Sequence, residues 1–126
     1  MFATLHELDE EPGAMLLVPG EVRLVDEASS EAWRVVRDEA FAAIHQPIEL
    51  IVDLADFVLE PNAIGFWGPS EREFLARRIT QVVRFGRSQL PITTTLIEVA
   101  GRRYGFPANL AEDRAAAVAM LRSLRG

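Results

Sequence analysis

The pattern of apolar and polar residues along the chain is organised around one short apolar run. The run from Ile48 to Leu54 is apolar at every position except Glu49 and Asp53. Short runs rich in β-branched residues are typical of strands that are buried on both faces, as in parallel sheets. The run therefore predicts the central strand of a sheet. Polar residues follow it at once, at the strand end where open α/β sheets place their sites.

Turn and capping residues delimit the elements around this run. Asp9–Gly13 contains a Pro-Gly pair, which interrupts a strand, so the first two strands are expected to be antiparallel. Asp26 is a typical N-cap in front of a helical repeat of apolar residues. Two glycines and a proline between residues 62 and 69 disfavour a long helix there. Ser70, followed three residues later by Glu73, forms a capping box, so the next helix is expected to begin at Ser70.

These signals predict a single α/β domain over residues 1–126, in the order ββαβαβαβα. The expected sheet is mixed, mostly parallel and five-stranded, with about four helices. The expected strands are Phe2–Leu8, Ala14–Val18 (resumed briefly at Glu21–Leu24), Ile48–Asp53, Gln81–Phe85 and Phe106–Leu110. The expected helices are Glu27–Ile44, Ser70–Arg78, Ile92–Tyr104 and Glu112–Leu124.

Composition narrows the class of protein. The chain has 126 residues, of which 49% are hydrophobic and 25% charged, which fits one packed domain. No apolar run approaches the roughly 20 residues of a membrane span, and the first residues lack the features of a secretion signal. The absence of cysteine fits a reducing cytoplasm. A net charge of −6 argues against nucleic acid and anionic membranes as partners.

The charge is unevenly distributed along the chain. Residues 1–60 carry 14 acidic residues and 3 arginines, whereas residues 61–126 carry 5 acidic residues and 10 arginines. One interpretation is electrostatic self-association of an acidic half with a basic half. The other is that the two halves interleave in one sheet and neutralise each other within one molecule.

The segment IVDLADFVLEPNAIGFW, together with the predicted order, resembles the STAS-type domains of bacterial anti-sigma-factor antagonists. Those domains have an apolar strand ending in Asp-Leu, a short acidic and apolar segment, and then Asp-Ser-Ser-Gly-hydrophobic-Gly opening a helix. Asp53 and Leu54 match the first part, and Ile64 and Gly65 match the end. Gly105–Leu124 looks like the strand-then-helix ending of STAS-like proteins. The resemblance covers residues 14–124 and implies a STAS-like fold and a non-enzymatic, protein-binding role.

One position departs from the motif of the family. The intervening segment is one residue shorter, and Asn62 takes the place of the serine that a kinase modifies in the family. Phosphorylation would add about two negative charges, and Asn62 cannot receive them. The resemblance therefore implies binding through this loop without a phosphorylation switch.

The expected partner-binding loop follows the central strand. Its residues are Asp56, Glu60, Asn62, Gly65, Phe66 and Trp67. Exposed aromatic residues beside glycine often anchor interfaces, whereas buried ones close a core, and both interpretations of Phe66 and Trp67 remain open. The partner is expected to be a protein or a second copy of the chain, as in a homodimer. Changing Asn62 to Asp or Trp67 to Ala is expected to alter association without unfolding the chain.

Other side chains suggest weaker alternatives. Asp53, Asp56 and Glu60 could bind Mg²⁺ in a hydrolase, or could simply be solvated. The two histidines, His6 and His45, are too few for a transition-metal site in a chain without cysteine, so no metal or cofactor is expected.

The arginines of the second half suggest a possible anion patch at Arg77, Arg78, Arg84 and Arg87, with a solvated face as the alternative. A further alternative function is the binding of a small apolar, lipid-type ligand. The candidate lining of such a pocket is Met15, Phe66, Trp67, Ile92 and Leu96.

Overall fold

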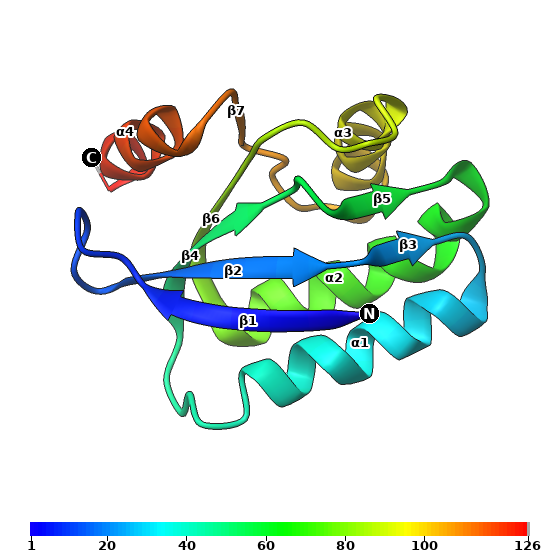
Figure 1. The fold of residues 1–126 in the computed structure, drawn as a ribbon, viewed down its shortest axis with the longest axis horizontal. Helices are drawn as coiled ribbons and strands as arrows, with labels where there is room; N and C mark the ends of the chain where they lie inside the picture. Colours follow the sequence, from blue (N-terminus) through cyan, green and yellow to red (C-terminus); the bar gives the residue numbers. More distant parts are fainter. Residues whose placement is uncertain (126) are drawn as a thin grey trace.

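Five strands form one mixed sheet in the order β1-β2-β4-β6-β7 (Figure 1). These strands are β1 (Phe2–Glu7), β2 (Ala14–Gly20), β4 (Ile48–Asp53), β6 (Ile79–Phe85) and β7 (Leu110–Ala111). The structure is a computed structural model that describes residues 1–125. β1 is antiparallel to β2, and every other neighbouring pair in this sheet is parallel. The predicted mixed sheet, with Ile48–Asp53 at its centre, is confirmed.

Helices cover both faces of this sheet. They are α1 (Glu27–Ala40), α2 (Ile64–Arg78), α3 (Ile92–Tyr104) and α4 (Arg114–Leu124), with a 3₁₀ turn η1 (Pro61–Ala63) before α2. Side chains of a strand alternate between its two faces, and β4 shows the division. Leu50 and Val52 lie in the core shared with α1, α2 and α3, whereas Ile51 lies in the core under α4. Across residues 1–125, no helix combines the length and the hydrophobicity that crossing a membrane requires.

A second, two-stranded sheet extends the first and was not predicted in full. β3 (Val22–Leu24) and β5 (Phe57–Leu59) pair in parallel. The backbone amide of Leu59 donates to the Thr93 hydroxyl at the start of α3. β3 corresponds to the brief continuation expected at Glu21–Leu24. β5 was missed because three apolar residues between a turn and a proline carry no periodicity.

The largest correction concerns the start of α2. The helix begins at Ile64, six residues before the predicted Ser70, and it contains Gly65, Gly68 and Pro69. Gly68 allows α3 to approach closely, because a Cβ at this position would lie 2.3 Å from the ring of Tyr104. Pro69 removes one intrahelical hydrogen bond, and burial of the first turn against the core outweighs that loss.

Two smaller boundaries also differ from the prediction. α1 ends at Ala40 rather than at Ile44, and the last strand is Leu110–Ala111 rather than Phe106–Leu110. Phe106 instead packs into the main core, and Gly105 ends α3 in the left-handed conformation, with φ of 84°. Its amide donates to the Gly101 carbonyl, so the expected role of Gly105 as the residue that ends this helix is confirmed.

Candidate functional site

The segment between β4 and α2 is held by backbone contacts to its neighbours. The Asp53 carboxylate accepts a hydrogen bond from the amide of Ala55, 2.9 Å away, which shapes the bend after β4. The amide of Leu54 donates to the carbonyl of Phe85, so the bend is tied to the end of β6. The amide of Glu60 donates to the carbonyl of Leu24. These contacts fix the position at which η1 and α2 begin.

Two adjacent aromatic residues on the first turn of α2 point in different directions. Trp67 is 3% exposed and lies between Phe57 and Phe106, at ring centroid distances of 6.0 and 5.7 Å. Phe66 is 45% exposed. Consecutive helical residues are about 100° apart around the axis, so burial of Trp67 turns Phe66 towards the surface. Trp67 is therefore a core residue of helix α2, so of the two interpretations left open by the sequence the buried one holds for Trp67.

Phe66 lies in a groove between the amino-terminal halves of α1 and α2. The groove has a volume of about 740 Å³. Its α2 side is formed by Gly65, Phe66, Pro69 and Ser70, and its α1 side by Asp26, Glu27, Ala28, Ser30 and Glu31. We call this feature the Phe66 groove. An exposed aromatic ring in a concave, partly apolar surface is the type of position that anchors protein interfaces.

Acidic side chains form the α1 rim of the Phe66 groove. The Asp26 carboxylate caps α1 by accepting from the backbone amide of Ser29, 2.9 Å away. This bond, and a second one from the Ser29 hydroxyl, lower the pKa of Asp26 below its ordinary value. A hydrogen bond from Arg34 likewise lowers the pKa of Glu31. Both carboxylates are therefore ionised at neutral pH, and Arg34 offsets the charge of Glu31, so within residues 1–125 Asp26 carries the unpaired negative charge of the two.

The three carboxylates considered for a metal site do not converge. Asp53 bonds the amide of Ala55, whereas Glu60 pairs with Arg23 at 2.8 Å. Asp56 is exposed and lies 3.4 Å from the side-chain amide of Gln89. Within residues 1–125, no group of three acidic or histidine side chains is arranged to hold a metal ion. Asn62 is exposed on η1, four residues before Phe66.

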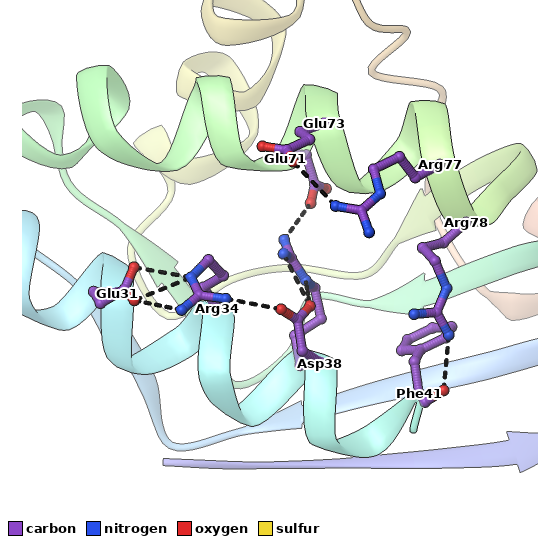
Figure 2. A network of polar contacts seen from close by, with 9 residues as sticks. Glu31, Arg34, Asp38, Phe41, Glu71, Glu73, Arg77 and Arg78 are labelled. Carbon is purple, nitrogen blue, oxygen red and sulfur yellow. Dashed lines mark hydrogen bonds and ion pairs between the residues drawn. The ribbon is translucent and has the colours of Figure 1, made fainter. Parts of the chain in front are cut away.

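The four arginines proposed as an anion patch lie in different environments. Arg77 is exposed and pairs with Glu73, and Arg78 donates to the carbonyl of Phe41 at the end of α1 (Figure 2). Arg78 also donates to the carbonyl of Ile44, in the loop after α1. Arg87 is exposed after β6. Arg84 is fully buried, so its assignment to a surface patch is wrong.

Arg84 belongs to a buried ionic network that the sequence analysis missed. Its guanidinium donates to Glu71 of α2 at 2.8 Å and to the carbonyls of Pro107 and Ala108. On the other side of Glu71 lies Arg37 of α1, whose Nη1 is 3.6 Å from the Glu71 carboxylate. The Arg37 guanidinium also stacks 4.1 Å from the Phe74 ring centre. One sequence signal was available, since Arg84 interrupts the apolar strand QVVRF.

The residues proposed to line an apolar ligand pocket are dispersed. Trp67 and Leu96 lie in the core, whereas Phe66 and Ile92 are exposed. A cavity does lie between α1, α2 and the sheet, and it is lined by Trp67, Arg37 and Glu71 among others. Its volume is about 20 Å³, enough for one water molecule and far below the roughly 300 Å³ of a small-ligand pocket.

Comparison with known proteins adds one solved structure. No model of a protein family and no curated protein matches the chain. The structure of the murine anion transporter Solute Carrier 26 family member A9, in the inward-facing state, matches with a TM-score of 0.65 over 98% of this chain, at 12% sequence identity. The match spans 23% of the transporter chain and corresponds to its STAS domain. The STAS-like fold expected from the sequence is confirmed.

Proposed function

We propose that this chain is a non-enzymatic protein-interaction module of the STAS type that binds a protein partner at the Phe66 groove. The observation that carries the proposal is the placement of Phe66. Its ring is 45% exposed in a groove, while the adjacent Trp67 is buried and fixes the orientation of the turn. A rigidly presented aromatic ring loses little conformational entropy on binding.

The acidic rim defines the chemistry of the partner. Asp26, Glu27 and Glu31 line the groove together with the apolar surface of Ala28 and Pro69. We expect the partner to contribute an apolar side chain that packs on Phe66 and basic side chains that approach the rim. Because Asn62 accepts no phosphoryl group, we expect no phosphorylation switch at this position.

The proposal is tested by comparing partner capture by the wild-type chain and by Phe66→Ala. Tagged protein is expressed in its own host, and captured proteins are quantified by mass spectrometry. We expect Phe66→Ala to reduce recovery of the specific partner at least tenfold, because interface anchors are typically worth about 2 kcal/mol or more. Asn62→Asp, four residues before Phe66, is expected to strengthen capture modestly, because the added carboxylate favours a basic partner.

Ile92→Ala is the matched control, because Ile92 is also a large apolar side chain on a first helical turn and is 43% exposed. This variant should capture as much partner as the wild-type chain. Both variants should also unfold at the wild-type temperature, since neither side chain is buried. Equal recovery with Phe66→Ala and with the wild-type chain would show that the groove is not the binding surface.

A further inference from the structure

The strand at one margin of the main sheet has an unpaired edge. β1 is the terminal strand of the order β1-β2-β4-β6-β7, and its described contacts are chiefly with β2 and α1. An exposed strand edge offers a row of free N–H and C=O groups, which natural proteins commonly block with lysine, proline or a bulge. The sequence of β1, FATLHE, contains neither lysine nor proline, and its pairing with β2 is regular over all six residues.

The adjoining surface of α1 combines small apolar side chains with one glutamate. α1 contacts β1 more than any other strand, so this helix lies next to the β1 margin of the sheet (Figure 1). Arg34, Arg37 and Asp38 of α1 line the side facing α2. At 100° per residue, Ala32, Val36 and Glu39 fall on the opposite side, whereas Val35 lies on the face turned away from the buried Trp33. Val35 is 42% exposed, although it lies in the middle of a helix whose other surface positions are largely charged.

We propose that the β1 edge and this side of α1 form a homodimer interface, in which β1 pairs antiparallel with β1 of a second copy. Such pairing would join two five-stranded sheets into one continuous sheet and bring the two α1 helices together around a two-fold axis. A second copy fits this edge because the peptide groups of Ala3 and Leu5 in one strand can bond those of the same two residues in its equivalent across a two-fold axis. This interface is separate from the Phe66 groove, and the two proposals stand independently.

The alternation of side chains restricts the register of the paired strands. Residues directly opposite each other must share a face, so a shift by one residue would mismatch every pair. Centring the pair on Thr4 places Thr4 opposite Thr4 and Phe2 opposite His6, and it leaves the charged Glu7 outside the paired region. Phe2 is 50% exposed, and this register would cover its ring with a cross-strand neighbour.

The position of Pro19 in β2 indicates which backbone N–H groups of β1 are free to bond a second strand. Pro19 lies opposite Ala3 in the β1–β2 ladder and has no amide hydrogen to donate. Prolines in sheets occupy positions whose nitrogen points away from the neighbouring strand. Because bonded and non-bonded pairs alternate, Ala3 and Leu5 then direct their peptide groups towards the free edge. In the register centred on Thr4, these two residues bond each other across the two-fold axis.

The first test is sedimentation analysis across a range of concentrations. The strand and the helix are each about 20 Å long, so the interface is at the small end of specific ones, and we expect a dissociation constant of roughly micromolar order. Ala32→Glu should weaken the dimer at least tenfold by adding a second carboxylate, beside Glu39, to each copy's side of the interface. Ile92→Glu, which adds the same charge at a similarly exposed position, should leave it unchanged.

Salt distinguishes this interface from an ionic one. Glu39 lies on the same side of α1 as Ala32, so like charges approach each other in the dimer and added salt should strengthen it. Association of an acidic half with a basic half would weaken with salt instead. A wild-type chain that stays monomeric up to about 1 mM, or a dimer that salt dissociates, would overturn the proposal.

The second test uses the absence of native cysteine. In the proposed register, the Cα atoms of two opposed Thr4 residues lie about 4.5 Å apart, within the range of a disulfide. Thr4→Cys is therefore expected to give a covalent dimer on mild oxidation. His6→Cys is the control, because its two copies would lie roughly 13 Å apart, too far to bridge. Equal cross-linking of both variants, or of neither, would overturn the register.

Discussion

At the scale of single residues, the environment of a side chain decides its role more than its chemical type. Phe66 and Trp67 are both aromatic and adjacent, yet one is half-exposed and the other is enclosed by Phe57 and Phe106. Trp67→Ala is therefore expected to destabilise the fold as well as to affect any association. Truncating a buried Trp typically lowers the free energy of unfolding by about 3–5 kcal/mol, whereas Phe66 can be truncated freely. The two substitutions separate stability from binding.

The two glutamates Glu71 and Glu73 give a matched comparison on one helix. Glu71 lies between two buried arginines, whereas Glu73 pairs with Arg77 in solvent. Glu71→Gln leaves buried positive charge without its counterion, so we expect the free energy of unfolding to fall by about 3–5 kcal/mol. Glu73→Gln should change it by less than about 0.5 kcal/mol. Urea denaturation measures both, and equal small effects would show that the buried network contributes no more than a surface pair.

At the scale of elements, the two glycines at the start of α2 differ in how closely the neighbouring helix approaches them. A Cβ on Gly68 would lie 2.3 Å from the Tyr104 ring, whereas one on Gly65 would meet only the Tyr104 hydroxyl, at 3.9 Å. Gly68→Ala should therefore destabilise the chain by about 1–3 kcal/mol, because the α2–α3 contact must shift. Gly65→Ala should stabilise it by up to about 1 kcal/mol through helix propensity.

Thermal unfolding of the two variants distinguishes this account from simple helix propensity. Propensity alone predicts that both alanines raise the melting temperature. Tertiary packing predicts a rise for Gly65→Ala and a fall for Gly68→Ala. Gly68→Ala combined with Tyr104→Ala, which removes the clashing ring, should lose less stability than the two separate losses together, because the residues are coupled.

At the scale of the whole molecule, the arrangement of strands in the sheet was easier to predict than the residues at which helices begin. The buried run at Ile48–Asp53 and the Pro-Gly turn of Asp9–Gly13 were enough to predict a central parallel strand and an antiparallel start. Both features depend on local composition. The start of α2 was mispredicted because the packing of Gly68 against Tyr104 involves residues 36 positions apart. The exposure of Phe66 could not be predicted for the same reason, since it follows from where that helix begins.

The charge asymmetry of the sequence corresponds, at least in part, to contacts within one molecule. Glu10 and Glu11 follow β1, and they pair with Arg114, Arg122 and Arg125 of the carboxyl-terminal helix region. Arg125 also pairs with Glu49 at the start of β4. The interpretation that the acidic and basic halves neutralise each other in the fold is therefore supported at these contacts. Ion pairs connect α4 to the β1–β2 turn, and apolar packing of Val118 and Leu121 connects it to the sheet.

The stability that these ion pairs give to α4 should depend on pH. Hydrogen bonds from Arg125 and Arg122 lower the pKa of Glu11 below its ordinary value of 4.5, and one from Arg114 lowers that of Glu10. A carboxylate with a lowered pKa contributes stability that is complete above the ordinary value and is lost as the pH falls through the folded value. Hydrogen-exchange protection of the α4 amides, corrected for intrinsic rates, should therefore fall below about pH 4.5, before protection of β4 does. In the Glu11→Gln variant, the α4 amides should be less protected at neutral pH and should lose less further protection in acid. Identical pH profiles for this variant and the wild-type chain would contradict the role of these ion pairs.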